Sequence, residues 1–172
     1  CAWGGKPVEA FTSMEALKAL PEAKGVVERR AKAEAAWNPK KAMENFNKQK
    51  AAFDAKLKEW QKDKKGKKPR GPRKPTDPGQ NPSLASTIYN GMISPLAGYG
   101  AKGAIWYQGE SNANGGTASV YEELLGCMVA DWRKRWGNEM SFYWVQLANF
   151  RAPTTTPLSL IHISEPTRQW QI

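Results

Sequence analysis

The stretch GAIWYQGESN, residues 103–112, decides the fold of this 172-residue chain. Its first five residues form an apolar run, which ends abruptly in four polar side chains around one glycine. A short apolar run bounded by turn residues is typical of a buried strand. We therefore expect a buried strand at residues 103–107 and a polar loop at residues 108–112.

The sequence after this loop predicts a helix and a second strand. Ser119 and Glu122 have the spacing of a capping box, which marks the start of a helix. Gly137 marks its end. The apolar residues of this helix have helical spacing and are expected to be buried: Val120, Leu124, Met128 and Trp132. A second apolar run, residues 142–147, predicts another buried strand.

A strand, a helix and a strand at this spacing form a βαβ unit, with a parallel sheet and a right-handed crossover. In such sheets ligands bind beyond the carboxyl ends of the strands. Three segments are expected there: the Trp3-Gly4-Gly5 turn, the loop at 106–112 and residues 146–149. Adjacent glycines allow the backbone to approach a ligand closely.

The part before this unit is polar and helical. Thr12 and Glu15 match a capping box for a short helix that ends near Pro21. Asn38-Pro39 begins a second, longer helix within residues 22–68. That helix carries an apolar seam of Met43, Phe46, Phe53, Leu57 and Trp60. A preceding helix offers a partner face of Val26, Val27, Ala33 and Trp37, so we expect a helical hairpin. Residues 67–82, rich in Pro, Gly and Lys, form a linker.

The net charge of +10 lies in one segment. Residues 38–74 hold 14 Lys/Arg and 4 Asp/Glu, and the remainder of the chain holds 12 of each. The segment is mostly lysine, without the arginine and aromatic residues that read or stack on bases. It is expected to be a solvated, peripheral insertion. Two alternatives stay open: a basic nucleic-acid-binding module, and a surface that packs on a partner subunit through Phe46, Phe53 and Trp60.

Metal, disulfide and membrane chemistry have no support in the sequence. Cys1 and Cys127 have no metal or disulfide spacing, so we expect no metal and no cofactor. No apolar run approaches the roughly 20 residues of a membrane span. The chain begins at Cys1 without a leader, which leaves the compartment open.

Residues 158–168, LSLIHISEPTR, match a translated transposase-type sequencing adapter. We therefore interpret residues 158–172 as an artefact of read-through. This matters for mechanism because His162 is the only histidine in the sequence. A serine nucleophile activated by histidine would then have no native base.

Ser111 has three interpretations. As a nucleophile it lacks the second glycine of the Gly-x-Ser-x-Gly elbow, because Ala113 stands there. As a loop residue it only satisfies backbone groups. In the third interpretation the loop orients substrate or binds an oxyanion, using the amides of Gln108 and Asn112 and the backbone N–H of Gly109. A glycosidase pair of Glu9 and Glu110 is not expected.

Four blocks in order resemble the sialate O-acetylesterases of the SGNH (GDSL-like) hydrolase superfamily: CAWGGKPVEAF, YNGMISPL, GAIWYQGESN, and DWRKRWG followed by FYWVQLANF. The resemblance implies a three-layer α/β/α fold with a parallel sheet and hydrolysis of O-acetyl esters on sialic acid or other sugars. It also implies a periplasmic or secreted enzyme that acts on an O-acetylated sugar and not on nucleic acid or a membrane. The lysine-rich segment resembles an insertion in some bacterial members.

The nucleophile of that family lies in a Gly-Gln-Ser-Asn block, and its histidine in an Asp-x-x-His block. Neither block occurs in this chain, so we expect an internal fragment without esterase activity. The resemblance assigns the oxyanion side to Gly4, Gly5, Gln108, Gly109 and Asn112, with Gln108 and Asn112 favoured as donors. Glu110 is expected to hold the loop, and the substrate side comprises Trp3, Asn90, Glu110 and Ser111. The hydrolase core is expected at residues 1–21 and 81–157, around an insertion and linker at 22–80.

Overall fold

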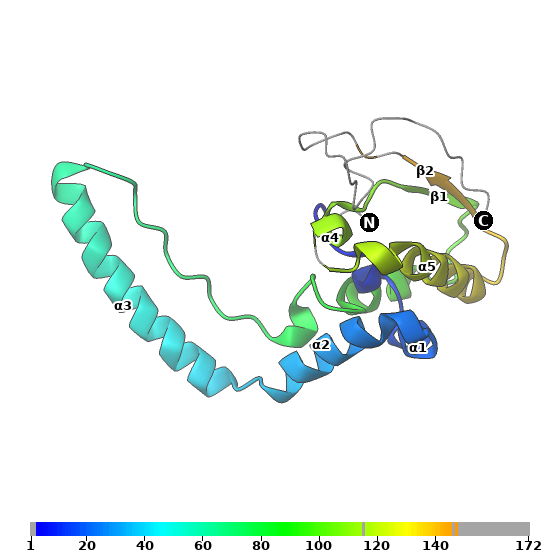
Figure 1. The fold of residues 1–172 in the computed structure, drawn as a ribbon, viewed down its shortest axis with the longest axis horizontal. Helices are drawn as coiled ribbons and strands as arrows, with labels where there is room; N and C mark the ends of the chain where they lie inside the picture. Colours follow the sequence, from blue (N-terminus) through cyan, green and yellow to red (C-terminus); the bar gives the residue numbers. More distant parts are fainter. Residues whose placement is uncertain (1–2, 115, 146, 148–172) are drawn as a thin grey trace. The chain divides into compact units, whose positions relative to one another are not determined.

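The computed structural model describes residues 3–114, 116–145 and 147. The chain forms two compact units, Cys1–Ala31 with Asn81–Ile172, and Lys32–Gln80. The boundary between the units lies within helix α2, Lys24–Ala35. Figure 1 traces the described chain from its amino-terminal turn to the strand β2.

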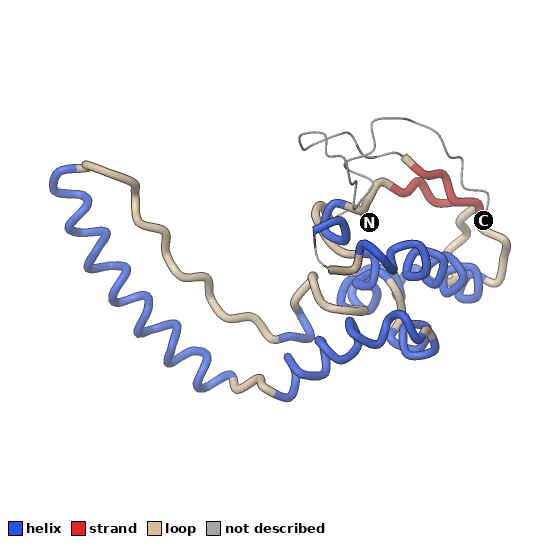
Figure 2. Tube along the Cα trace, in the orientation of Figure 1, coloured by secondary structure: helices blue, strands red, loops and turns tan. Residues whose placement is uncertain are grey.

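The larger unit contains a parallel pair of strands. β1, Gly103–Trp106, pairs with β2, Ser141–Trp144, so that Gly103 lies opposite Ser141 and Trp106 opposite Trp144. The helix α5, Tyr121–Trp136, connects them in sequence and lies under the pair in Figures 1 and 2. The predicted parallel strand–helix–strand unit is confirmed.

The core forms where α5 meets the amino-terminal segment. Leu124, Met128 and Trp132 are buried as predicted, and Val120 is partly buried. α5 ends at Gly137, whose φ of 63° is left-handed, a backbone conformation that glycine adopts without strain. Trp106, at the end of β1, places its ring edge-on to Phe11 and Trp132, with centroid separations of 5.2 and 5.9 Å. These aromatic contacts fix the sheet to the helix below it.

Two expected helix caps differ from the structure. In α1, Met14–Ala19, the cap is Ser13 and not Thr12: Ser13 Oγ accepts from the Ala16 N–H at 3.2 Å. Thr12 instead donates its hydroxyl to the Val8 carbonyl. Ser119 does not cap α5, because a 3-10 turn, Ala118–Val120, precedes the helix and no side chain caps it. Capping-box spacing cannot distinguish a helix start from a turn that leads into one.

Short helical turns connect the larger elements. They are η1, Val8–Phe11; η2, Pro21–Ala23; η3, Pro78–Gln80; η4, Tyr89–Ile93, which is a π-helical turn; η5, Ser94–Leu96; and α4, Glu110–Asn114. The sequence block YNGMISPL thus folds as η4 and η5. No helix in the described part of the chain is long and apolar enough to cross a membrane.

The prediction that both strands are buried is wrong. Ile105 is 79% exposed and Tyr143 is 65% exposed. Alternate side chains of a strand point to opposite faces, and α5 with the core covers only one face of this pair. Parallel sheets are generally covered on both faces. The described residues supply one helical layer, so the three-layer arrangement remains an expectation.

The smaller unit is built on α3, Pro39–Asp63. Asn38 caps it as predicted, with Oδ1 accepting from the Lys41 N–H at 3.0 Å. The linker lies against its apolar seam: a β-carbon placed on Gly71 would lie 3.3 Å from the Phe53 ring, and Trp60 Nε1 donates to the Gly66 carbonyl at 3.3 Å. Figure 1 shows the linker returning along α3.

The expected helical hairpin is therefore corrected. Val26 is buried in the core of the larger unit, and Val27 packs against that core. These side chains cannot also cover the seam of α3, so the linker takes the place of the expected partner helix. The seam was identified correctly, but its partner was not.

Candidate functional site

The polar loop follows directly from the carboxyl end of β1, as predicted. Trp106 ends the strand and Glu110 begins α4. Gly109 lies between them with a φ of 143°, which side chains disfavour. A β-carbon there would come within 3.0 Å of Leu147 Cδ1. The loop can take this path only because residue 109 is glycine.

Asn112 is the buried centre of this loop, with 1% of its surface exposed. Its Oδ1 accepts from the Val8 N–H at 2.9 Å, and its Nδ2 donates to Glu9 Oε2 at 2.9 Å and to Thr117 Oγ1 at 3.0 Å. The Val8 N–H can only donate, so it fixes which end of the amide faces it. Asn112 therefore joins α4 to η1.

Gln108 forms a second bridge between the same segments. Its Nε2 donates to the Lys6 carbonyl at 2.8 Å and to Asn112 Oδ1 at 2.7 Å. Its Oε1 accepts from the Tyr121 hydroxyl at 2.8 Å. Burial raises the pKa of Tyr121 to about 12, so this phenol stays protonated and keeps donating at neutral pH. The Gln108 side chain is thus fixed at both ends.

Glu9 supplies the carboxylate of this network. It is 2% exposed, and its Oε1 lies 3.7 Å from Arg29 Nη2 of α2. Buried carboxylates require hydrogen bonds or opposite charges. Here the Asn112 amide and the Arg29 guanidinium meet that requirement, so Glu9 has a structural environment.

The Gly4-Gly5 turn is covalently next to this network. Gly5 has a φ of 64°, and a β-carbon on either glycine would meet nothing within 4 Å. The next residue, Lys6, accepts the bond from Gln108, and Val8 donates to Asn112. The hydrogen bonds therefore bring together the amino-terminal turn and the polar loop, which are about 100 residues apart in sequence.

Three of the other predicted site residues, Trp3, Glu110 and Ser111, belong to the amino-terminal turn or to the polar loop, and Asn90 belongs to neither. Trp3 is 50% exposed, with the Lys6 ammonium 5.9 Å from its ring centre. Glu110 is exposed at the first position of α4, and Ser111 is half-buried beside it. Asn90 is exposed in η4, and among the described residues no hydrogen bond joins its side chain to the loop. The buried residue that anchors the loop is Asn112.

Both amide N–H groups of Gln108 and of Asn112 are donated to protein acceptors in this structure. An amide nitrogen has two hydrogens, so these side chains have no further donor to offer a ligand without losing an internal bond. Their arrangement can hold backbone N–H groups in place, which is one way of building an oxyanion site.

Several predictions fall outside the described residues. They concern Gln146, residues 148–149 of the second polar segment, and the tail at 158–172 with His162. The interpretation of the tail as adapter sequence stays a prediction.

Among the described residues, no group of three His, Cys, Asp or Glu side chains is arranged to hold a metal. Burial raises the pKa of Cys127, which disfavours a reactive thiolate.

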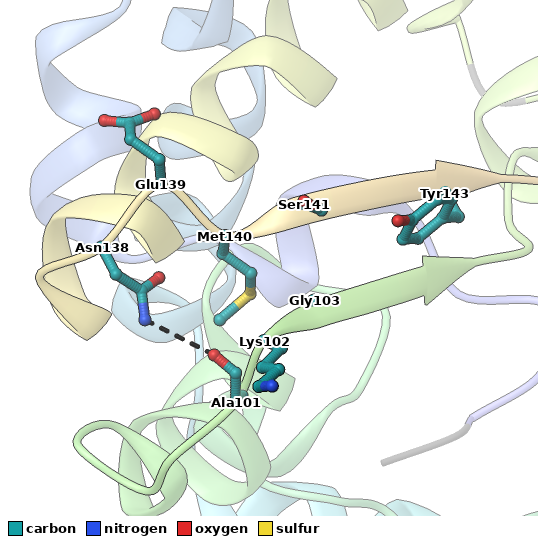
Figure 3. A pocket seen from close by; sticks show the side chains of 8 residues that line it. All are labelled: Ala101, Lys102, Gly103, Asn138, Glu139, Met140, Ser141 and Tyr143. Carbon is teal, nitrogen blue, oxygen red and sulfur yellow. Dashed lines mark hydrogen bonds between the residues drawn. The ribbon is translucent and has the colours of Figure 1, made fainter.

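A pocket of about 530 Å³ lies at the opposite end of the strands (Figure 3). Its lining includes Lys102 and Gly103 at the start of β1, and Met140 and Ser141 at the start of β2. Ligands of parallel sheets bind at the carboxyl ends of the strands. We therefore place the candidate site at the polar loop and not in this hollow.

Sequence reasoning missed Glu9, Thr117 and Tyr121. Glu9 and Thr117 accept from the Asn112 amide and Tyr121 donates to the Gln108 amide, at 2.8–3.0 Å. The signal that points to them is indirect: two amide side chains in one tight loop need several buried acceptors and donors. The pattern does not say which residues supply them.

Comparisons with known proteins agree with one another. A family model described as carbohydrate esterase, sialic acid-specific acetylesterase, matches residues 42–167. The chain is 32% identical to a sialate O-acetylesterase of Rattus norvegicus over 134 residues, which is 77% of this chain and 21% of that protein. It is 43% identical to the sialate O-acetylesterases of Homo sapiens and Pongo abelii over 53 residues, or 31% of this chain and 10% of those proteins. No solved structure matches.

The chain thus spans about a fifth of the length of the rat relative. These relatives are mammalian, so they do not support the bacterial comparison for the lysine-rich segment. The family match begins within α3, and Gly4 and Gly5 lie before it. Gln108 and Asn112 lie in the matched region. They form hydrogen bonds with Lys6 and Val8, which follow the two glycines closely in sequence.

Proposed function

The chain belongs to the sialic acid-specific acetylesterase family of carbohydrate esterases, and on this premise we propose that the protein of which it is part hydrolyses O-acetyl esters of sialic acid or a related sugar. The resemblance also implies a periplasmic or secreted enzyme, and we include that in the proposal. The site described above would be the oxyanion side of the reaction centre.

One observation carries this proposal: the polar loop is hydrogen-bonded to Lys6 and Val8, in the segment that directly follows the Gly4-Gly5 turn. Gln108 binds the Lys6 carbonyl at 2.8 Å, and Asn112 binds the Val8 N–H at 2.9 Å. Hydrolysis of an acetyl ester passes through a tetrahedral intermediate with a negatively charged oxygen. Fixed N–H donors stabilise that charge without reorganising during the reaction.

We assign the donor role to backbone N–H groups of Gly4, Gly5 and Gly109. The amides of Gln108 and Asn112 are already engaged, so their role is to position these glycines. Glycine suits such places because no β-carbon blocks the ligand; around Gly4 and Gly5 that space is open. Trp3, Asn90, Glu110 and Ser111, exposed or half-buried, remain candidates for contacts with the sugar.

We further propose that the 172-residue chain alone does not turn over an ester. Within the described residues, no hydrogen bond joins Ser111 Oγ to a basic side chain. A serine without a base is a weak nucleophile at neutral pH. In the family that this chain resembles, the nucleophile and the histidine belong to blocks that its sequence does not contain.

The test compares this chain with a longer form that includes the flanking coding sequence. Both are assayed on 4-nitrophenyl acetate and on O-acetylated sialic acid. We expect turnover by the longer form, with or without Ser111→Ala, and none above buffer by this chain. Turnover by this chain that disappears with Ser111→Ala would make Ser111 the nucleophile. A longer form that hydrolyses neither ester would overturn the esterase proposal.

A further inference from the structure

The cationic segment at residues 38–74 has charges that the fold does not use. It holds 14 Lys/Arg and 4 Asp/Glu, and twelve of the cations are lysine. In this fully described segment one ion pair forms, between Lys50 and Asp54 at 3.0 Å. The other thirteen cations therefore have no carboxylate partner among the residues that the structure describes. Such an excess of like charge opposes compaction unless counter-ions or an anionic partner neutralise it.

The linker has a regular sequence that spaces part of this charge evenly. Prolines occur at every third position, 69, 72, 75 and 78, and each is partly or fully buried. The cations before and between them are all exposed: Lys67, Lys68, Arg70, Arg73 and Lys74. A period of three is that of the polyproline II helix. We name residues 64–78 the proline strap; its prolines are partly or fully buried, and its cations are exposed.

The strap contacts two residues of the apolar seam of α3, Phe53 and Trp60. The Phe53 ring lies under Gly71, and Trp60 donates to the Gly66 carbonyl while Lys68 Nζ lies 5.9 Å over its ring. Polyproline II rises about 3.1 Å per residue, so successive turns of the strap present cations about 9 Å apart. In that conformation the strap would be an extended, semi-rigid row of positive charge.

We propose that this row binds an anionic glycan, a chain of carboxylate-bearing sugars such as sialic acids; the choice of glycan rests on the proposed function. Repeated carboxylates along a flexible chain suit lysines, which act as point charges without a fixed hydrogen-bonding plane. The row would hold the polymer near the esterase, while the site itself acts on single acetyl groups.

Two other anionic partners fit the structure less well. A membrane surface would need apolar side chains to insert, and in the described part of the chain the large exposed apolar side chains all lie outside residues 32–80. A single-stranded nucleic acid would favour exposed aromatic rings for base stacking. Here Phe53 and Trp60 lie beneath the strap.

The experiment measures binding of the 172-residue chain to fluorescent polysialic acid without acetyl groups, at 0.15 M and 0.5 M NaCl. Dextran, a DNA duplex and vesicles of phosphatidylserine in phosphatidylcholine are measured in parallel. The variant is Lys67→Gln, Arg70→Gln, Arg73→Gln. Its matched control removes three exposed lysines of the larger unit, Lys18→Gln, Lys24→Gln and Lys102→Gln. Circular dichroism verifies that both variants keep the helical content.

We expect polysialic acid to bind at 0.15 M NaCl, at least tenfold more weakly in the strap variant, and within twofold of wild type in the control variant. Binding should fall steeply at 0.5 M NaCl, and dextran should not bind. Absence of polysialic acid binding at 0.15 M NaCl overturns the proposal, whether or not DNA or vesicles bind. So does equal weakening by the two variants. The polymer carries no ester, so this result does not depend on whether the longer protein proves to be an esterase.

Discussion

Asn112 Nδ2 donates a hydrogen bond of 2.9 Å to Glu9 Oε2, across 103 residues of sequence. Both side chains are buried, at 1% and 2% exposure, and each has further partners: Gln108 and Val8 for Asn112, and Arg29 for Glu9. Buried polar groups that satisfy each other specify one geometry, because any displacement leaves several of them unpaired. The candidate site depends on this pair.

Replacing Asn112 with alanine should destabilise the chain by about 3 kcal/mol or more, because the Val8 N–H, a Gln108 N–H and the Glu9 carboxylate lose their partner in a buried site. Urea unfolding followed by circular dichroism measures the loss. Ser111→Ala, one residue away on the same short helix and half-buried, is the control and should change stability by less than about 0.5 kcal/mol. Equal effects of the two substitutions would refute the central role of Asn112.

Replacing Asn112 with aspartate tests the charge of the same pair. It puts a second carboxylate against Glu9, and two adjacent carboxylates raise the pKa of one of them. A raised folded-state pKa gives stability that is present at low pH and lost as pH rises. Asn112→Asp should therefore be much less stable than wild type at pH 7. The difference in free energy of unfolding between the two proteins should become smaller as the pH falls from about 7 to about 4. A gap that stays constant with pH would argue against contact between residues 112 and 9.

Position 109 requires glycine for two reasons, its backbone conformation and the lack of room for a β-carbon. Its φ is 143°, and a β-carbon would come within 3.0 Å of Leu147 Cδ1. Gly109→Ala should cost about 1–3 kcal/mol in stability. The control is Gly126→Ala in α5, where a β-carbon meets nothing within 4 Å; it should stabilise the helix by about 0.5–1 kcal/mol. If both variants shift the urea midpoint in the same direction, the loop does not have the conformation described.

The sequence allowed prediction of elements whose evidence is local. The parallel strand pair followed from two apolar runs separated by a helical pattern, and the end of α5 followed from Gly137. Contacts between residues far apart in the chain could not be predicted from the sequence. Nothing near Asn112 indicates that its acceptor is Glu9, because that choice depends on how η1 packs beside α4.

The apolar seam of α3 illustrates the same limit. Its periodicity predicted one buried stripe, and the stripe is partly buried, by the strap. Helical spacing of apolar residues indicates that one face of a helix is buried, but it does not identify the segment that packs against that face. A proline at every third position was the available signal for the strap, since that period matches polyproline II and not a turn-rich linker.

The Tyr121 hydroxyl should make stability fall in alkaline solution. Burial raises its pKa to about 12, above the value of about 10 in an unfolded chain. The stabilisation is therefore fully present below pH 10 and is lost as pH rises from 10 to 12, by about 3 kcal/mol in total. Urea unfolding at pH 8, 10 and 11.5 measures the decline, and absorbance at 295 nm follows the ionisation of tyrosine.

Tyr121→Phe separates this effect from other tyrosines, including Tyr89, whose pKa burial also raises. The variant should be less stable than wild type at pH 8 by about 1 kcal/mol, because Gln108 Oε1 loses its donor. It should then lose less stability than wild type as the pH rises, so the two curves approach or cross. Tyr143→Phe, at a position 65% exposed, should follow the wild-type curve. A Tyr121→Phe curve parallel to wild type would mean that the phenol is not held protonated by burial against Gln108.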